Sequence, residues 1–142
     1  MSSSTTNAIC VFLPPFIQFL RKLNAELGLS PARFQVMQAL EKENELTMVE
    51  LAERLSVSKR NITTLVDGME RDDLAGRHPH PSDRRSTLVK MTETGKSVYL
   101  EASSYQTERL DNLFAVLDRR QEKALIEALF TITEELTTNS KR

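Results

Sequence analysis

Between residues 47 and 71 the apolar side chains keep the spacing of an α-helix, but a short interruption divides them into two runs. The runs consist of Leu51, Ala52 and Leu55, and of Ile62, Leu65, Val66 and Met69. Thr47 and Glu50 form a Thr-x-x-Glu capping box ahead of the first run. Because only residues 56–58 separate the runs, the sequence predicts two helices joined by a tight turn.

The periodicity changes after Leu74, where the chain can no longer continue as a helix. Pro79 and Pro81 each lack the backbone N–H that a helix interior needs, and residues 86–91 read as a strand. We therefore predict a β-hairpin with a long polar tip directly after the second helix. The expected fold class is mainly α with a small β-hairpin wing, which is a winged helix-turn-helix.

The amino-terminal part carries a seam of apolar residues with alternating steps of four and three, typical of a helix that packs along another helix. Residues 1–7 are rich in Ser and Thr, and we expect them to form a frayed arm. Because Pro14 and Pro15 interrupt the seam, the first helix is expected to start near Pro14 and to end at Gly28. The seam consists of residues 9, 13, 16, 20, 23 and 27.

The carboxyl-terminal part predicts two more helices, the first capped by Thr92 and the second starting at Asp118. The first bears Val98, Ala102, Tyr105, Leu110, Leu113, Phe114 and Leu117, and the second bears Leu125, Leu129, Ile132 and Leu136. We expect one domain over residues 1–142. Within it, residues 30–92 form a winged-helix lobe, and residues 8–28 and 93–138 form a helical dimerisation region.

Charge is unevenly placed along this chain, whose formal net charge is −1. Residues 54–90 hold eight Lys or Arg against five Asp or Glu, which leaves this segment with a net charge of +3. A locally basic centre suits a protein that meets phosphate with one face. No apolar run approaches the roughly 18 residues of a membrane helix, so we expect a cytoplasmic protein that does not bind membranes.

The second helix of the pair, residues 58–71, is a candidate DNA-recognition helix. A helical wheel puts Ile62, Val66 and Met69 on one face and polar or basic residues on the other. Arg bonds guanine bidentately, Asn bonds adenine, and Thr suits either base or phosphate. The predicted DNA-binding residues of this helix are Ser58, which should cap it, and Lys59, Arg60, Asn61, Thr63 and Thr64.

The hairpin tip places Arg84 and Arg85 on a short solvated loop, one element after the candidate helix. A basic finger beside a recognition helix reaches the adjacent minor groove, where narrow A/T-rich DNA attracts Arg. Both arginines are therefore predicted to bind DNA. Asp83 is expected to orient the wing by holding the Arg85 guanidinium in a charge-assisted bond.

Three stretches of this chain resemble the MarR family of regulators. They are residues 51–58 (LAERLSVS), residues 66–71 (VDGMER), and residues 81–85 (PSDRR) followed by residues 91–95 (MTETG). The resemblance implies that residues 58–64 read the major groove and that Asp83 and Arg85 match the family's wing Asp-x-Arg. The chain departs from the family pattern at residues 73–75, where Asp replaces the usual Gly, and at His80, where an acidic residue is common.

The resemblance also implies a two-fold dimer and, in many members, release from DNA when a small aromatic or anionic ligand binds. We expect a homodimer on an inverted-repeat operator in duplex DNA, with two recognition helices about 10 base pairs apart. Its expected function is a transcription regulator, most simply a repressor that blocks a promoter and is relieved by such a ligand. No cofactor and no enzymatic activity are predicted, because the sequence has no Gly-rich phosphate loop or His-Glu-x-x-His motif.

Two alternatives stay open. Some members of this family sense peroxide through one cysteine in the first helix, and Cys10 lies near that region; among apolar neighbours it is otherwise a buried apolar filler. The other alternative is a winged-helix module that contacts protein and lacks DNA affinity. A metal-responsive regulator is disfavoured, because His78 and His80 stand alone on the wing.

Overall fold

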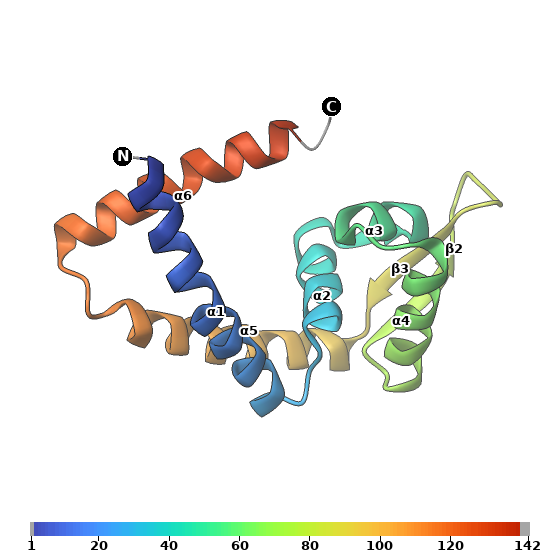
Figure 1. Ribbon diagram of the computed structural model, residues 1–142. Coiled ribbons are helices and arrows are strands. Elements are labelled where there is room, and N and C mark those ends of the chain that lie inside the picture. Colours follow the sequence, from blue (N-terminus) through green and yellow to red (C-terminus); the bar gives the residue numbers. More distant parts are fainter. Residues whose placement is uncertain (1, 140–142) are drawn as a thin grey trace. The chain divides into compact units, whose positions relative to one another are not determined.

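The computed structural model describes residues 2–139, and the side chains of residues 4–139. These residues form six helices and a three-stranded sheet (Figure 1), which confirms the predicted fold class. The chain divides into two compact units, residues 1–104 and residues 105–142, and each is taken by itself below. Among the described residues, no helix combines the length and apolar character that a membrane span requires.

The predicted helix pair consists of α3 (Met48–Leu55) and α4 (Lys59–Arg71). The capping box of α3 is complete, since the Thr47 hydroxyl accepts from the Glu50 amide at 3.1 Å and the Glu50 carboxylate accepts from the Thr47 amide at 2.8 Å. Ser56 ends α3 in the left-handed region with φ of 53°. Ser58 caps α4 by accepting from the Asn61 amide at 3.1 Å, as predicted.

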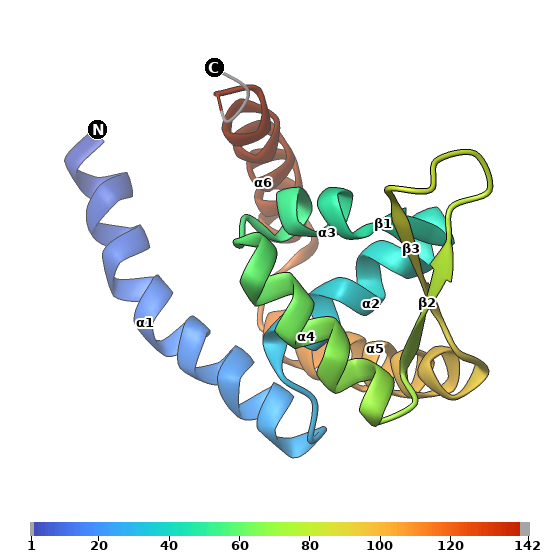
Figure 2. The same ribbon diagram turned by 90° about the vertical axis from the view of Figure 1, so that its right-hand side faces the viewer.

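The wing belongs to a small antiparallel sheet of β1 (Glu45–Thr47), β2 (Ala75–Pro79) and β3 (Thr87–Met91). Its strand order is β1-β3-β2, so β3 is central and β2 is an edge strand. Figure 2 shows β2 and β3 crossing beside α4, with their connecting loop projecting beyond the helices. Arg77 lies opposite Val89 in the register of this hairpin.

The core of the winged-helix lobe lies among α2 (Pro31–Glu43), α3, α4 and β3. Ser30 caps α2 and Pro31 opens it, as the sequence predicts. The fully buried residues come from every one of these elements, so the apolar faces read from helical spacing are the faces that pack. They are Val36, Met37 and Leu40, Leu51, Ile62, Val66 and Met69, and Val89.

The lobe is closed by a tight junction between the end of α4 and the start of α5 (Glu93–Phe114). Asp73 takes the left-handed conformation with φ of 55°, as its substitution for glycine requires. The Leu74 carbonyl accepts from the Thr92 amide, and the Thr92 hydroxyl caps α5 by accepting from the Gly95 amide. A Cβ on Gly95 would lie 1.9 Å from the Leu74 carbonyl oxygen, so only glycine fits this approach.

The first helix differs from its prediction. α1 (Ser2–Glu26) begins far ahead of Pro14, and the residues 2–7 expected in a frayed arm are helical; Met1 lies outside the described residues. Pro14 and Pro15 leave the carbonyls of residues 10 and 11 without helical partners, but both residues are exposed and water can bond these oxygens. Stacking of the Phe12 and Phe16 rings, 4.8 Å between centroids, spans the prolines.

At its other end α1 stops as predicted. Gly28 has φ of 64°, its amide bonds the Ala25 carbonyl, and the Leu29 amide bonds the Asn24 carbonyl. This pair of bonds is a Schellman motif, which needs a left-handed residue at the position that Gly28 holds.

The second unit contains the end of α5 and all of α6 (Arg119–Asn139). Asp118 and Gln121 cap α6 reciprocally, with bonds of 2.8 and 3.1 Å, as the sequence predicts. Leu117, expected on α5, instead follows its end at Phe114. α6 has no buried residue, although its apolar stripe is intact. The exposed members of the stripe are Ile126, Leu129, Phe130, Ile132 and Leu136.

Candidate nucleic-acid interface

The amino-terminal half of α4 presents the predicted DNA-binding side chains on one exposed surface. Ile62 and Val66 are fully buried against the lobe, so the residues between and before them are turned outward. The exposed residues are Ser58, Lys59, Arg60, Asn61, Thr63 and Thr64. The structure thus brings together every site residue predicted on this helix.

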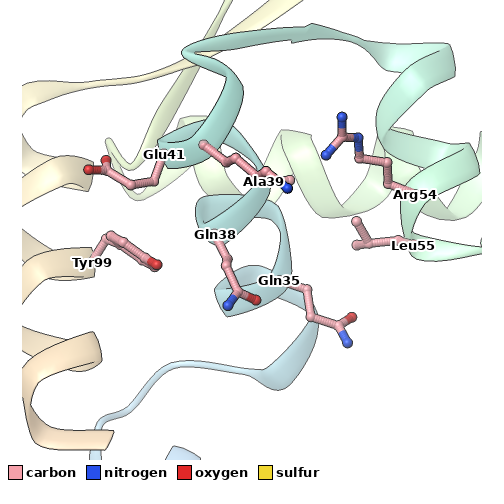
Figure 3. A pocket seen from close by; sticks show the side chains of 8 residues that line it. Gln35, Gln38, Ala39, Glu41, Arg54, Leu55 and Tyr99 are labelled. Atoms are coloured by element: carbon pink, nitrogen blue, oxygen red, sulfur yellow. The ribbon is translucent and has the colours of Figure 1, made fainter. Parts of the chain in front are cut away.

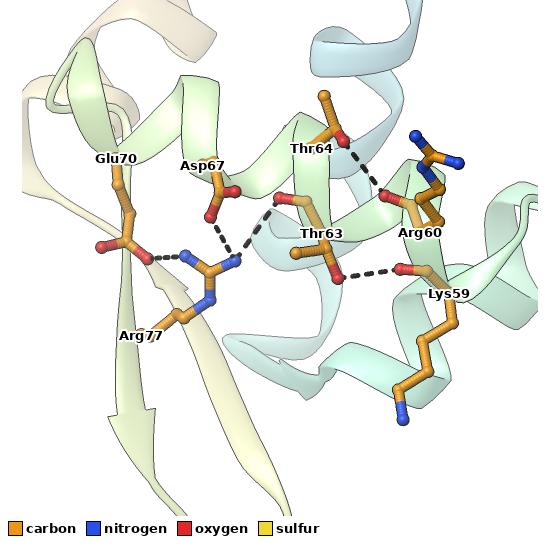
Figure 4. Close-up of polar contacts among 7 residues, drawn as sticks. All are labelled: Lys59, Arg60, Thr63, Thr64, Asp67, Glu70 and Arg77. Carbon is orange, nitrogen blue, oxygen red and sulfur yellow. Dashed lines mark hydrogen bonds and ion pairs between the residues drawn. The ribbon is translucent and has the colours of Figure 1, made fainter.

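Thr63 and Thr64 also bond their own helix (Figure 4). The Thr63 hydroxyl donates to the Lys59 carbonyl at 2.8 Å, and the Thr64 hydroxyl donates to the Arg60 carbonyl at 3.1 Å. These bonds fix the rotamers of both side chains, so their outward atoms are held in place.

The carboxyl-terminal half of α4 is acidic and is held by an arginine from the wing. The Arg77 guanidinium lies between Asp67 and Glu70, at 2.7 and 2.5 Å, and also reaches the Thr63 carbonyl at 3.4 Å (Figure 4). Partial burial acts to lower the pKa of Arg77, but its bonds to the two carboxylates outweigh burial and raise the pKa. This role of Arg77 could not be predicted from the sequence, because it depends on where β2 lies.

A second arginine holds the same half of α4 from α2. Arg33 Nη1 pairs with Asp72 Oδ2 at 2.6 Å, just past the end of α4. Its guanidinium also lies against Gly68, where a Cβ would come within 2.8 Å of Arg33 Nη2. The two arginines therefore fix the helix to its own domain through its acidic end.

These ion pairs show which cations of the basic segment, residues 54–90, are paired within the chain and which are not. Three of its cations are in ion pairs: Arg54 with Glu43, Arg77 with α4, and Lys90 with Glu45. Over the described residues, no carboxylate lies within 4.0 Å of the remaining cations of this segment, which are Lys59, Arg60, Arg71, Arg84 and Arg85. The five acids of the segment are all engaged inside the lobe. The positive charge left over therefore faces outward, on α4 and the wing.

The wing loop is organised by His80 and Asp83. His80 Nδ1 accepts from the amides of Ser82 and Asp83, at 3.2 and 3.1 Å, and these two bonds shape the turn. The Asp83 carboxylate accepts from the Arg85 amide at 3.0 Å and from the Ser86 hydroxyl at 2.9 Å.

These bonds correct the expected contact of Asp83. Its carboxylate holds the backbone of Arg85 and not the guanidinium, because both of its oxygens are used to close the loop. The bond from the Arg85 amide, followed by that from Ser86, lowers the pKa of Asp83 below its usual value. Arg84 and Arg85 are both exposed, so their side chains remain available to a partner outside the lobe.

A cleft of about 600 Å³ lies between the helix pair and the wing. Lys59 and Thr63 of α4 line it together with Arg77 and Arg85 of the hairpin. Val49, which is 61% exposed, and Ala52 contribute an apolar wall from α3. Lys59 and Arg85, two of the cations without an ion pair, thus border one concave surface, although they are 26 positions apart in the sequence.

A second cleft, of about 550 Å³, lies between α2, α3 and α5 (Figure 3). Its lining includes Gln35, Gln38 and Glu41 from α2, with Tyr99 from α5 at one side. The Tyr99 ring packs on Phe34, 5.5 Å between centroids. Burial, followed by the nearby charge of Glu41, raises the pKa of Tyr99, so its hydroxyl is neutral and can donate a hydrogen bond.

Two further sequence interpretations meet the structure here. Cys10 is exposed, so its interpretation as a buried apolar filler is wrong. Within the part of the chain that the structure describes, no group of three or more His, Cys, Asp or Glu is placed to hold a metal ion.

Comparison with known proteins gives a consistent pattern. A sequence model of the MarR family matches residues 27–86. The transcriptional repressor YetL of Bacillus subtilis is 38% identical over 72 residues, which are 49% of this chain but only 43% of YetL. The chain therefore spans less than half of that relative.

Solved structures agree over more of the chain. The transcriptional repressor CouR, bound to a 23-mer DNA duplex, superposes with a TM-score of 0.70 and 30% identity, covering 80% of each chain. A MarR family protein from Bacillus stearothermophilus superposes with a TM-score of 0.83 over 96% of this chain and 95% of its own, at 21% identity, and shows likeness of fold alone. These relatives are named as regulators and not as enzymes, in agreement with the sequence prediction.

Proposed function

Since this chain belongs to the MarR family of winged-helix regulators, we propose that it is a transcription regulator that binds duplex DNA in a sequence-specific way. The amino-terminal half of α4 enters the major groove, and the wing tip contacts the adjacent minor groove. One observation carries this proposal. Within the described chain, the cations of residues 54–90 that have no ion pair all lie on α4 and the wing, and two of them, Lys59 and Arg85, border the same cleft.

The proposed roles follow from side-chain chemistry. Arg60 and Asn61 read base edges, while Lys59, Thr63 and Thr64 contact bases or phosphate. The Ser58 hydroxyl oxygen accepts from the Asn61 amide at the amino-terminal end of α4, and the helix dipole at this end favours phosphate. In the wing, Arg84 and Arg85 reach DNA, and Asp83 orients them by closing the loop backbone.

The active form in this proposal is a homodimer on an inverted repeat, with its half-sites about one DNA turn apart. The exposed apolar stripes of α1 and α6 support this assembly, because large apolar patches of this kind are rare on monomers. On α1 the stripe includes Ile9, Phe12, Leu13 and Ile17. Residues 8–28 and 93–138 form the dimerisation region, and residues 30–92 remain the lobe that meets DNA.

We also propose that the dimer represses by occupying a promoter and that a small aromatic or anionic ligand relieves repression. The cleft beside Tyr99 supports a ligand of this class, since it pairs an aromatic ring with hydrogen-bonding amides. YetL and CouR are both named repressors. A protein that binds chromosomal DNA acts where this DNA is, and we place it in the cytoplasm.

Selection of bound fragments from random duplex DNA tests the proposal. The full chain is expected to enrich an inverted repeat, and its affinity for that duplex should fall steeply as salt rises from 50 to 200 mM, because bound phosphates release counterions. Binding that shows no enrichment and no salt dependence would instead favour a protein-interaction module.

The redox alternative has its own test. Cys10→Ser is expected to leave DNA affinity and its response to peroxide unchanged. A wild-type protein that loses its DNA on peroxide treatment, while the variant keeps it, would make Cys10 the sensor.

A further inference from the structure

We propose that Arg77 is a positioning residue, which clamps the wing onto α4 so that both meet the same duplex. This inference rests on the proposed function. Its basis is one side chain on β2 that bonds Thr63, Asp67 and Glu70, residues spaced by four and three along a single face of α4.

The geometry of the clamp suits arginine alone. Its planar fork places Nη2 on Asp67 and Nη1 on Glu70, so the strand cannot rotate about one bond without breaking the other. The Arg77 side chain is only 29% exposed, and Asp67 and Glu70 are 51% and 38% exposed. The guanidinium is therefore the most shielded of the three groups, and its geometry is fixed by the two simultaneous bonds.

The wing needs such a clamp because β2 is an edge strand. Strand pairing holds β2 only on its β3 side, and it ends with the bond from the His80 amide to the Ser86 carbonyl, where the loop begins. On the other side of β2, the bonds from Arg77 are the charged contacts that the described chain makes between this strand and α4. Loss of these bonds would leave Arg85 on a hairpin with a wider range of directions.

The direction in which DNA affinity changes when Asp67 and Glu70 are neutralised tests the proposal. Asp67 and Glu70 lie on the helix that meets phosphate, so through electrostatics alone their neutralisation would strengthen DNA binding. As anchors of Arg77, they would weaken DNA binding when neutralised. The double variant Asp67→Asn with Glu70→Gln keeps side-chain shape and separates the two expectations.

The matched control is Glu43→Gln with Glu45→Gln. These two acids are also in ion pairs, with Arg54 and Lys90, and their neutralisation changes the net charge by the same amount. Neither pair joins the wing to α4, so the control should bind DNA as well as wild type or slightly better.

The dissociation constant for the selected duplex is measured by fluorescence anisotropy at several salt concentrations. We expect Asp67→Asn with Glu70→Gln, and separately Arg77→Gln, to weaken binding by about three- to tenfold. The triple variant should be no weaker than Arg77→Gln, because the three side chains act as one unit. The slope of affinity against salt should stay unchanged, whereas loss of a direct phosphate contact would reduce it by about one.

Wing mobility is read independently from a nitroxide label at Ser82→Cys in a Cys10→Ser background. The acid double variant is expected to increase the mobility of this label and not that of a label at Ser97→Cys on α5. Thermal unfolding identifies a variant that has lost its fold, and Arg77→Lys, which keeps the charge without the fork, then replaces Arg77→Gln.

Tighter or unchanged DNA binding by the acid double variant would overturn the proposal. Additive losses in the triple variant would do the same, since Arg77 would then contact DNA itself. The proposed function fails separately, when wild type shows no salt-dependent DNA affinity, and the label at position 82 then still reports whether the clamp holds the wing.

Discussion

The helices α4 and α6 have the same kind of amphipathic pattern and opposite fates in the structure. In α4 the apolar stripe is sealed, with Ile62, Val66 and Met69 all 0% exposed. In α6 no residue is buried, and Phe130 remains 69% exposed. Helical spacing therefore identifies which residues share a face. Whether that face is buried depends on other elements that pack against it. The described residues cover the apolar face of α4 and leave that of α6 exposed.

Truncation is expected to give the largest effect and to break this comparison most directly. Deletion of residues 119–142 removes α6 and should turn the proposed dimer into a monomer, whose affinity for the whole inverted repeat falls at least about 100-fold because the two half-sites are no longer bound together. Sedimentation and anisotropy measure the two losses. A truncated chain that stays dimeric would reject the assignment of α6, and Leu129→Asp in the full chain serves as the milder control.

A pair of leucines sharpens the same comparison. Leu51→Ala should lower the free energy of unfolding by about 2–5 kcal/mol, because its side chain is fully buried in the lobe. Leu129→Ala, at a position 53% exposed, should change unfolding only through the dimer, so its effect depends on protein concentration. Urea denaturation at two concentrations separates them. Equal, concentration-independent losses would mean that α6 is covered within one chain.

Two arginines compare the two DNA-facing elements. Arg60→Ala is expected to cost about 1–3 kcal/mol of binding free energy and to relax preference at one base position, because it removes a bidentate base contact. Arg85→Ala should cost less and leave sequence preference nearly unchanged, while it lowers the salt slope. Competition with operator variants gives both results. DNA affinity equal to that of wild type in both variants would contradict these roles.

The smallest effect concerns the pH dependence of the wing loop. Because the folded pKa of Asp83 is lowered, its stabilisation of the loop is present above the ordinary pKa of Asp, about 4, and is lost as pH falls through the folded value. Protection of the Arg85 amide from exchange, relative to an unstructured peptide at the same pH, should therefore fall as pH drops below about 4. Asp83→Asn, which keeps an acceptor oxygen but does not titrate, should remove that pH dependence. A wild-type loop indifferent to pH would show that other contacts close it.

Local chemistry in the sequence was sufficient to predict much of the lobe. The capping box of Thr47 and Glu50 and the cap at Ser58 each depend on residues within a few positions, and the structure has both. α1 was predicted too short, because the cost of a proline in a helix was weighed without the packing of Phe12 and Phe16 across it.

The parts of the site that escaped prediction are contacts between distant elements. No partner was predicted for Asp67 and Glu70, and only the placement of β2 shows that Arg77 bonds them. The sequence spacing places both acids on the same face of the helix, which indicates a shared partner. It does not identify that partner, which lies on β2. For Asp83 the correct partner residue was named, while the choice between its backbone amide and its guanidinium depends on the shape of the loop.

The inward bonds of Thr63 and Thr64 have a consequence for base recognition under the proposed function. Each hydroxyl proton is already given to a carbonyl of the preceding turn, so these side chains offer the groove a methyl group and an acceptor oxygen. A methyl packs on the thymine methyl, and the oxygen accepts from the amino group of adenine or cytosine. Neither group donates to guanine, whose major-groove edge presents only acceptors. Under the proposed function, these two positions therefore disfavour guanine, and its recognition depends on Arg60.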